Sequence, residues 1–210
     1  LHFVCCILLI LVCCKPEIPD NCEGEYYFKR PYTTNHPQGN ISLNDTLVLQ
    51  MTLSLNDYNY RSDSIVNINR FSKVLCGFEV KEIIQDSTNP VGCKDVGAKH
   101  EFGYSSPNVL LDLAEGIGGK NRVRYYLQKG NNSFVCTIKL VPKRKGAFYI
   151  HLLDGVIEDA FCNAGIGAFW GNYSPSTLVN IFQIVSGRVY DKQILERLMK
   201  NNLSYCFIVE

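Results

Sequence analysis

The ten cysteines have the widest range of chemistry in this 210-residue chain. A thiol can be acylated, can form a disulfide or can bind a metal ion. Four of the cysteines fall within residues 1–14, an apolar run in which His2 is the only polar residue. A secretory signal needs an apolar core of about 7–15 residues, whereas a membrane-spanning helix needs roughly 20. The run therefore predicts a signal peptide, and the rest of the chain is expected to work outside the cytosol.

The end of this run predicts a lipid attachment. The sequence Leu11-Val12-Cys13-Cys14 is similar to a bacterial lipobox, whose cysteine receives a thioether-linked diacylglycerol and becomes the mature N-terminus. Several acyl chains together hold a protein at a membrane without a span. Cys14 is the expected acceptor, although Cys13 stands where the motif usually has Gly, Ala or Ser. Cys13 as acceptor, an ordinary cleaved leader and a retained apolar anchor stay open as alternatives. Neither Met nor a basic residue precedes the run, so a leader truncated at its start is expected.

The leader is followed by six more cysteines: Cys22, Cys76, Cys93, Cys136, Cys162 and Cys206. In an oxidising compartment six cysteines allow fifteen pairings. Cys76 and Cys136 both fall on apolar strand faces, so a disulfide between them is one expectation and two buried free thiols are the other. No Cys-x-x-Cys motif is present and the histidines are scattered, so neither a metal site nor a cofactor is expected.

Catalytic patterns are weak. His151 and Asp154 are close in the sequence, but no Gly-x-Ser-x-Gly segment supplies a nucleophile. The segment 116–120 looks like part of a phosphate loop, but it lacks the first glycine and has Asn121 where Ser or Thr is required. No catalytic residue is assigned and no enzymatic activity is expected. An envelope hydrolase that uses His151 and Asp154 is the distant alternative.

The segment 165–170, with Tyr173 beyond it, is the best candidate for a ligand-binding loop. It combines glycines with Phe169 and Trp170, and exposed aromatic rings of this kind can stack on sugars or peptides. Trp170 and Tyr173 are the candidate contacts. The competing interpretation is that these rings pack in the core.

Alternation of apolar and polar residues predicts most of the secondary structure. It is clearest over 47–55, and it recurs over 74–80 and in a hairpin whose strands, 123–127 and 134–140, flank the tip 129–132. Helical spacing appears only over 191–200, after a plausible N-cap at Asp191. Many short strands predict a mainly β fold, an antiparallel β-sandwich with Ig-like architecture, decorated by one C-terminal amphipathic helix.

Composition predicts one globular domain. Apolar residues make up 46% and charged residues 20% of the chain, and the formal net charge is +1. Residues 15–21, with two prolines, are expected to form a tether, and residues 22–210 a single β-rich domain. Nucleic-acid binding is not expected, because it requires a concentrated basic surface.

The chain as a whole resembles a family of small envelope lipoproteins of unestablished activity from Bacteroidetes, of the flavobacterial type. The resemblance is carried by Cys14-Lys15, the aromatic segment 22–28 and the segments 43–47, 138–150 and 205–207. It implies a lipid-anchored outer-membrane protein that faces the periplasm or the cell surface. Its β-rich domain would be a non-catalytic binding or structural module. The implied partners are the membrane, through the lipid, and an envelope protein or glycan.

Five Asn-x-Ser/Thr sequons favour a second interpretation. In a eukaryotic secreted protein they would be sites of N-glycosylation on surface loops. A secreted, N-glycosylated β-domain protein is therefore the main alternative to the bacterial lipoprotein. The sequon asparagines are Asn40, Asn44, Asn131, Asn172 and Asn202.

Overall fold

The computed structural model describes residues 26–69, 71, 73–86, 88, 93–113, 121–158, 163–173 and 202–210. The described chain is mainly β, as predicted, and its one helical element is a single 3-10 turn, η1 (Lys99–Glu101). The strands are β1 (Tyr26–Thr34), β2 (Asn40–Ile41), β3 (Leu47–Ser54), β4 (Asn56–Asn59), β5 (Ser64–Asn67), β6 (Lys73–Gln85), β7 (Cys93–Gly97), β8 (Phe102–Ser105), β9 (Val109–Asp112), β10 (Arg122–Lys129), β11 (Ser133–Pro142), β12 (Gly146–Glu158), β13 (Asn163–Trp170) and β14 (Ser204–Val209).

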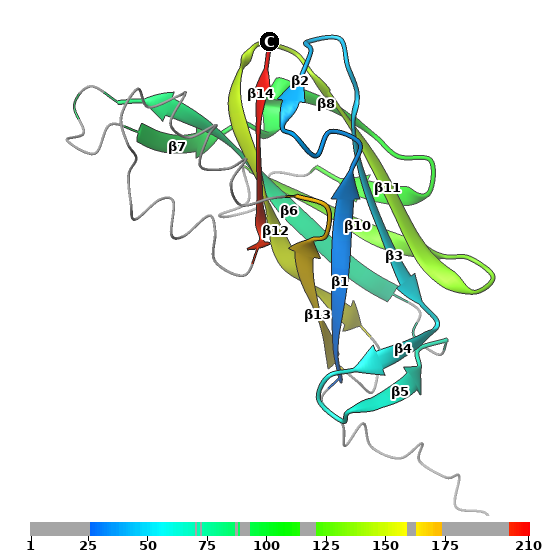
Figure 1. The fold of residues 1–210 in the computed structure, drawn as a ribbon. Coiled ribbons are helices and arrows are strands. Elements are labelled where there is room, and N and C mark those ends of the chain that lie inside the picture. Colours follow the sequence, from blue (N-terminus) through cyan, green and yellow to red (C-terminus); the bar gives the residue numbers. More distant parts are fainter. Residues whose placement is uncertain are drawn as a thin grey trace, which may run out of the picture.

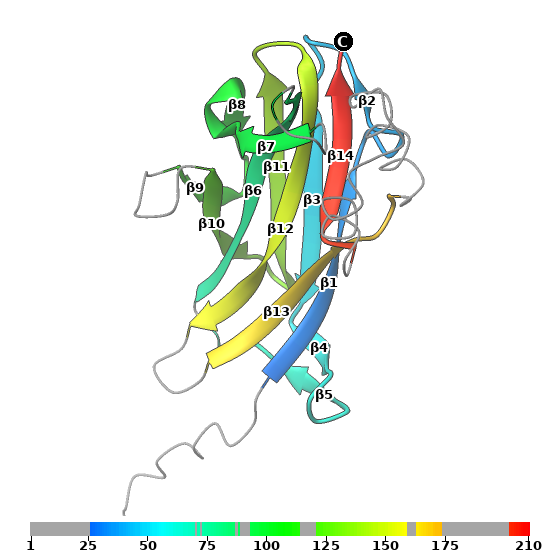
Figure 2. The same cartoon turned by 90° about the vertical axis from the view of Figure 1, so that its left-hand side faces the viewer.

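Seven of these strands form a closed barrel. Around the ring the order is β12, β13, β1, β3, β11, β10 and β6, and the pairing of β6 with β12 closes it (Figures 1 and 2). Ile150 lies opposite Val80 at this closure. The pairing of β1 with β13 is parallel, with Tyr27 opposite Gly165. Closure pairs both sides of each ring strand, which removes free sheet edges.

The prediction of an antiparallel sandwich was wrong in two respects. One sheet closes on itself instead of two sheets facing each other, and the β1–β13 and β2–β14 pairings are parallel. The 13-residue β12 shows how the sheet closes. On one edge it pairs with β14 over Gly146–His151 and with β13 over Gly155–Glu158, while its other edge pairs with β6, with a register shift between Leu153 and Val156. Alternation reveals which face of a strand is buried, but it does not reveal the neighbouring strand.

The alternating segments form strands as predicted. In β3, Leu47, Leu49, Met51 and Leu53 are all buried in the barrel interior, while the residues between them are more exposed. The predicted hairpin is β10–β11, closed at its tip by a hydrogen bond from the amide of Gly130 to the carbonyl of Ser133.

Several predicted segments lie outside the described residues. These are the signal peptide 1–14 with Cys14, the tether 15–21 and the helix 191–200. Within the residues that the structure describes, no helix has the length and apolar character to cross a membrane.

Candidate functional site

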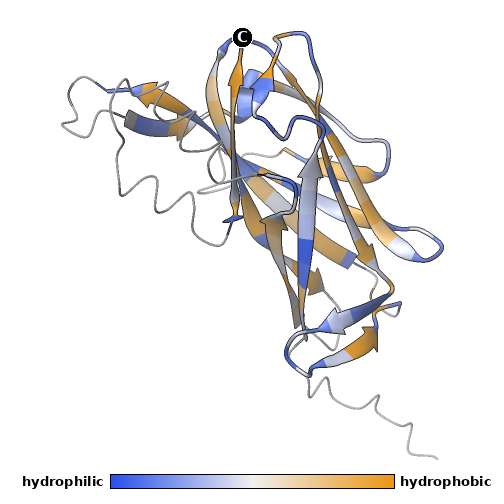
Figure 3. Cartoon of the chain, viewed as in Figure 1, coloured by the Kyte–Doolittle hydropathy of each residue, from blue (hydrophilic) through white to orange (hydrophobic). Residues whose placement is uncertain are grey.

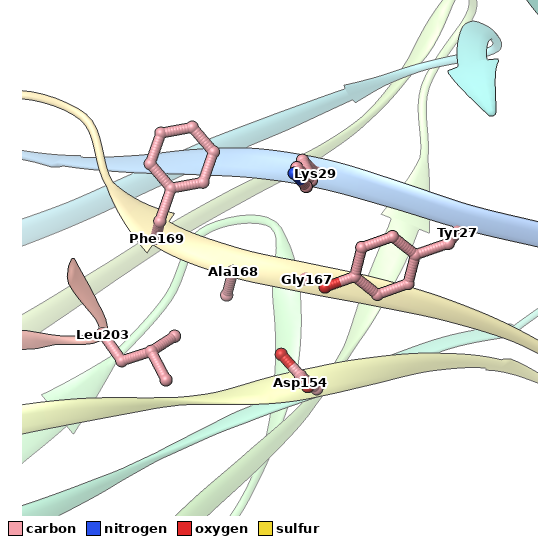
Figure 4. Close-up of a pocket in the computed structure, with 7 residues that line it drawn as sticks. All are labelled: Tyr27, Lys29, Asp154, Gly167, Ala168, Phe169 and Leu203. Carbon is pink, nitrogen blue, oxygen red and sulfur yellow. The ribbon is translucent and has the colours of Figure 1, made fainter. Parts of the chain in front are cut away.

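A groove with a volume of about 480 Å³ lies on the outer face of the barrel, where β1, β13 and β12 run side by side (Figure 4). Both aromatic rings and charged groups border it. The lining residues are Tyr27, Lys29, Asp154, Gly167, Ala168, Phe169 and Leu203.

Two glycines of β13 make room for the Tyr27 side chain. A β-carbon at Gly167 would lie 2.1 Å from the Tyr27 hydroxyl oxygen, and one at Gly165 would lie 3.2 Å from the ring. The ring of Tyr27 therefore crosses the neighbouring strand, which a larger residue at position 167 would prevent. A glycine within a strand often marks a place where another group approaches the backbone closely. The glycines that made this segment hard to assign from sequence thus shape one wall of the groove.

Asp154 and Tyr27 point toward one another from β12 and β1 (Figure 4). Burial and the nearby Asp154 carboxylate raise the pKa of Tyr27, and Arg61 opposes them. Tyr27 is therefore a neutral phenol at pH 7, able to donate a hydrogen bond. Lys29, two residues along β1, adds a cation to the same wall, with its Nζ 4.8 Å from the centre of the Tyr60 ring.

Trp170 and Tyr173 are both buried, which favours the interpretation that they pack in the core over the one that they contact a ligand. Trp170 is 1% exposed and its indole nitrogen donates to the carbonyl of Leu203 at 3.2 Å. Tyr173 is buried, and its hydroxyl donates to the carbonyl of Cys206 at 3.3 Å and accepts from the Cys206 amide at 3.1 Å. In β13 the even-numbered residues point inward, so Phe169 is the aromatic residue that faces the groove. The small residues Ala164, Gly165, Gly167 and Ala168 disguised this period of two.

His151 and Asp154 serve different parts of the outer surface. His151 Nδ1 lies 2.9 Å from the Ser204 hydroxyl, whereas Asp154 borders the groove beyond the irregularity in β12. His151 is also opposite Glu79 of β6, which accepts a 2.8 Å hydrogen bond from Arg122 of β10. This polar row of Ser204, His151, Glu79 and Arg122 links four adjacent strands, and sequence analysis missed it because each residue comes from a different segment.

The charge of Glu79 is expected to stabilise the polar row in a pH-dependent way. Burial raises the pKa of Glu79, but the hydrogen bond from Arg122 and the charges of Lys81, Arg122 and His151 outweigh it, so the pKa lies below the ordinary 4.5. Stability from a lowered carboxyl pKa is present above the unfolded-state pKa and is lost as the pH falls through the folded-state pKa. Glu79→Gln should lower the free energy of unfolding by about 1 kcal/mol at pH 7, allowing for solvent screening.

Urea denaturation of both proteins at several pH values between 7 and 3 checks this prediction. The difference between them should shrink below about pH 4.5. Asp63→Asn, at an exposed turn residue, should change stability by no more than about 0.5 kcal/mol throughout. A difference that stays constant with pH would show that the Glu79 charge is not its source.

Cys76 and Cys136 both lie in the barrel interior, as their strand faces predicted, and both are free thiols in the structure. They share this region with Tyr32 and Tyr125, whose hydroxyls are hydrogen-bonded to one another. Burial raises the pKa of the Cys76 thiol to about 12, so it is protonated at neutral pH. A Cys76–Cys136 disulfide stays a prediction. Cys206 is also buried and free.

The sequon asparagines differ in accessibility. Asn40, Asn44, Asn131 and Asn172 are exposed, and Asn202 is half-buried. The side-chain amide of Asn172 is also hydrogen-bonded to both backbone groups of Thr34, and the Asn202 amide donates to the carbonyl of Trp170. As for metals, no cluster of three or more His, Cys, Asp or Glu side chains suited to an ion occurs within the described ranges.

Comparisons with known proteins do not assign a family. No protein-family model and no curated protein matches the chain. Among solved structures, the second type II cohesin module from the adaptor ScaA scaffoldin of Acetivibrio cellulolyticus aligns with 8% identity and a TM-score of 0.33, over 68% of this chain and 87% of that one. The CupB6 tip adhesin from Pseudomonas aeruginosa aligns with 13% identity and a TM-score of 0.27, over 72% of this chain and 44% of that one. At TM-scores this low, neither likeness defines a function or a partner.

Proposed function

We propose that this protein is a lipid-anchored cell-envelope binding module without catalytic activity, and that its groove holds a segment of a glycan. It would belong to the Bacteroidetes lipoproteins that its sequence resembles, attached through Cys14 to the outer membrane. The observation that carries the binding function is the groove itself, in which aromatic and charged side chains project from three neighbouring strands. A site on strands of a closed sheet is held more rigidly than one on loops.

The chemistry of the groove suits a neutral polyhydroxylated ligand. Tyr27 and Phe169 offer ring faces for the apolar faces of sugar rings. Asp154 can accept hydrogen bonds from sugar hydroxyls, and Lys29 and the neutral Tyr27 phenol can donate them. Because one acidic and one basic group face the same space, the groove does not favour a strongly charged polymer such as nucleic acid. The groove is large enough for a small-ligand site.

Substitution of Tyr27 is expected to abolish most of the binding. Tyr27→Ala should weaken binding to the best saccharide on an array of bacterial-surface and plant-cell-wall oligosaccharides by roughly tenfold or more, the scale of a central aromatic contact. Gly167→Val should do the same, because its side chain would displace the Tyr27 ring from the groove. Tyr126→Ala is the control, since Tyr126 is 37% exposed on β10 and does not line the groove. Equal loss in all three variants, or no saccharide bound by the wild type, would contradict the glycan assignment.

The lipid attachment is tested separately. We expect the intact mass of protein expressed with its own leader, and the mass of its first peptide, to show a diacylated or triacylated Cys14. An unmodified N-terminus would refute the anchoring while leaving the groove untouched.

The exposed Asn40, Asn44 and Asn131 support the second candidate, a secreted eukaryotic glycoprotein. If glycans are attached at these asparagines, enzymatic deglycosylation of protein from its natural source should lower the mass of the protein. No such loss would leave the lipoprotein as the remaining proposal.

A further inference from the structure

The β4–β5 hairpin has an inverted distribution of polar and apolar side chains. Asp57 and Asn59 are 8% and 1% exposed, whereas Tyr58 and Tyr60 are 39% and 48% exposed. Within the described residues this hairpin forms a two-stranded sheet apart from the larger one. A strand in water normally turns its polar side chains outward. The outer face of the hairpin is therefore suited to contact with an environment that is less polar than water.

The exposed apolar and aromatic side chains of this outer face, which also carries Asn56 and Asn67, are Tyr58, Tyr60 and Ile65, and we call these three the hairpin patch. Tyr58 lies directly opposite Ile65 in the hairpin, and Ile65 is 75% exposed. The rings of Tyr58 and Tyr60 meet edge to face with their centres 4.9 Å apart, and the Lys29 ammonium lies over Tyr60. The apolar end of β5 stands out at the margin of the molecule in Figure 3.

The hairpin is fastened to the beginning of β1. The Tyr27 amide donates to the Asn59 side chain, and the Tyr60 amide donates to the Tyr27 carbonyl, each at 2.9 Å. An ion pair between Arg30 and Asp57 adds a third connection. β1 therefore begins at the end of the barrel where the hairpin lies, and both views show this arrangement (Figures 1 and 2).

We propose that the hairpin patch lies on the lipid bilayer and forms a second membrane contact beside the N-terminal lipid. This inference rests on the proposed acylation of Cys14. Tyr26 lies 12 positions after Cys14, and a fully extended chain of that length spans at most about 40 Å. The end of the barrel that carries the hairpin is thus the end kept close to the membrane.

The chemistry of the patch fits the region of lipid headgroups. Tyrosine rings gather at that depth because the ring is apolar and the hydroxyl is polar, and an aliphatic side chain can reach the acyl chains below. Contact at this end would direct the opposite end of the barrel, with β2 and the C-terminus, away from the bilayer (Figure 1).

Hydroxyl-radical footprinting of the full chain tests the contact with an internal control. The protein is compared on vesicles of phosphatidylethanolamine and phosphatidylglycerol and without vesicles. Tyr126 is as exposed as Tyr58 but lies on β10, outside the hairpin. On vesicles, oxidation of Tyr58 and Tyr60 relative to Tyr126 should fall roughly fivefold or more, as expected for rings at headgroup depth. Without vesicles the three tyrosines should react at similar rates.

Two outcomes would overturn the proposal. Equal oxidation of all three tyrosines on vesicles would show that the patch stays in water. Protection of Tyr58 and Tyr60 without vesicles, increasing with protein concentration, would assign the patch to contact between two copies of the chain. The intact mass of the same sample separates the two proposals: an acylated Cys14 with an unprotected patch refutes only the hairpin contact, and a protected patch without acylation refutes only the anchor.

Discussion

Replacement of Trp170 by alanine is expected to lower the free energy of unfolding by about 3–5 kcal/mol, the usual cost of removing a large buried aromatic side chain. Trp170 is 1% exposed, and its ring centre lies 6.0 Å from that of Tyr32 and 5.1 Å from that of Tyr205. The substitution would leave a cavity between β1, β13 and β14 and would remove the hydrogen bond to Leu203. Urea denaturation followed by circular dichroism measures the loss.

The neighbouring residue is the matched control for Trp170. Phe169 belongs to the same strand but faces the groove, so Phe169→Ala should cost about 1 kcal/mol or less in stability while weakening saccharide binding. Trp170→Ala should show the reverse pattern, with a large loss of stability and binding retained by the folded fraction. A Trp170 variant that unfolds like the wild type but no longer binds would restore the original prediction of a ligand contact.

Substitution of Asp57 by alanine is also expected to lower the free energy of unfolding by about 3–5 kcal/mol. The reason is that it leaves the charge of its partner buried and unpaired. The Asp57 and Arg30 side chains are only 9% and 14% exposed and form an ion pair between β4 and β1. Chemical denaturation gives the global loss. Hydrogen exchange should show in addition that the amides of residues 56–67 become the least protected, since this pair helps to hold the hairpin against the barrel.

A double variant tests whether the loss comes from the unpaired charge. Arg30→Leu/Asp57→Leu removes both charges, and such replacements of buried ion pairs are often neutral or stabilising. The double variant should therefore recover much of the stability lost in Asp57→Ala. If it is as unstable as the single variant, the contacts of the side chains matter more than their charges.

Local alternation allowed several features to be predicted from the sequence. The leucines of β3, the hairpin β10–β11 and the inward orientation of Cys76 and Cys136 all follow from the fact that successive side chains of a strand point to opposite faces. This rule depends only on neighbouring residues, so it applies before any tertiary contact is known. It was uninformative where glycine and alanine removed the contrast between faces, as in β13, and there the sequence left the core and a ligand-binding loop as alternatives for Trp170.

The candidate site could not be predicted because no local pattern brings its residues together. Tyr27 and Gly167 are 140 positions apart in the sequence, and Asp154 comes from a third strand. Their proximity depends on the parallel pairing of β1 with β13 and on the register shift in β12.

The sequence by itself determined that the chain is mainly β, which strand faces are buried and where the clearest hairpin turns. Only the tertiary structure decided that the sheet closes through β6 and β12, that Tyr27 crosses two glycines, and that the β4–β5 hairpin exposes its tyrosines. The physical reason is the range of the interactions. Side-chain alternation is set residue by residue, whereas the choice of partner strand and register depends on how all the buried faces pack together in one core.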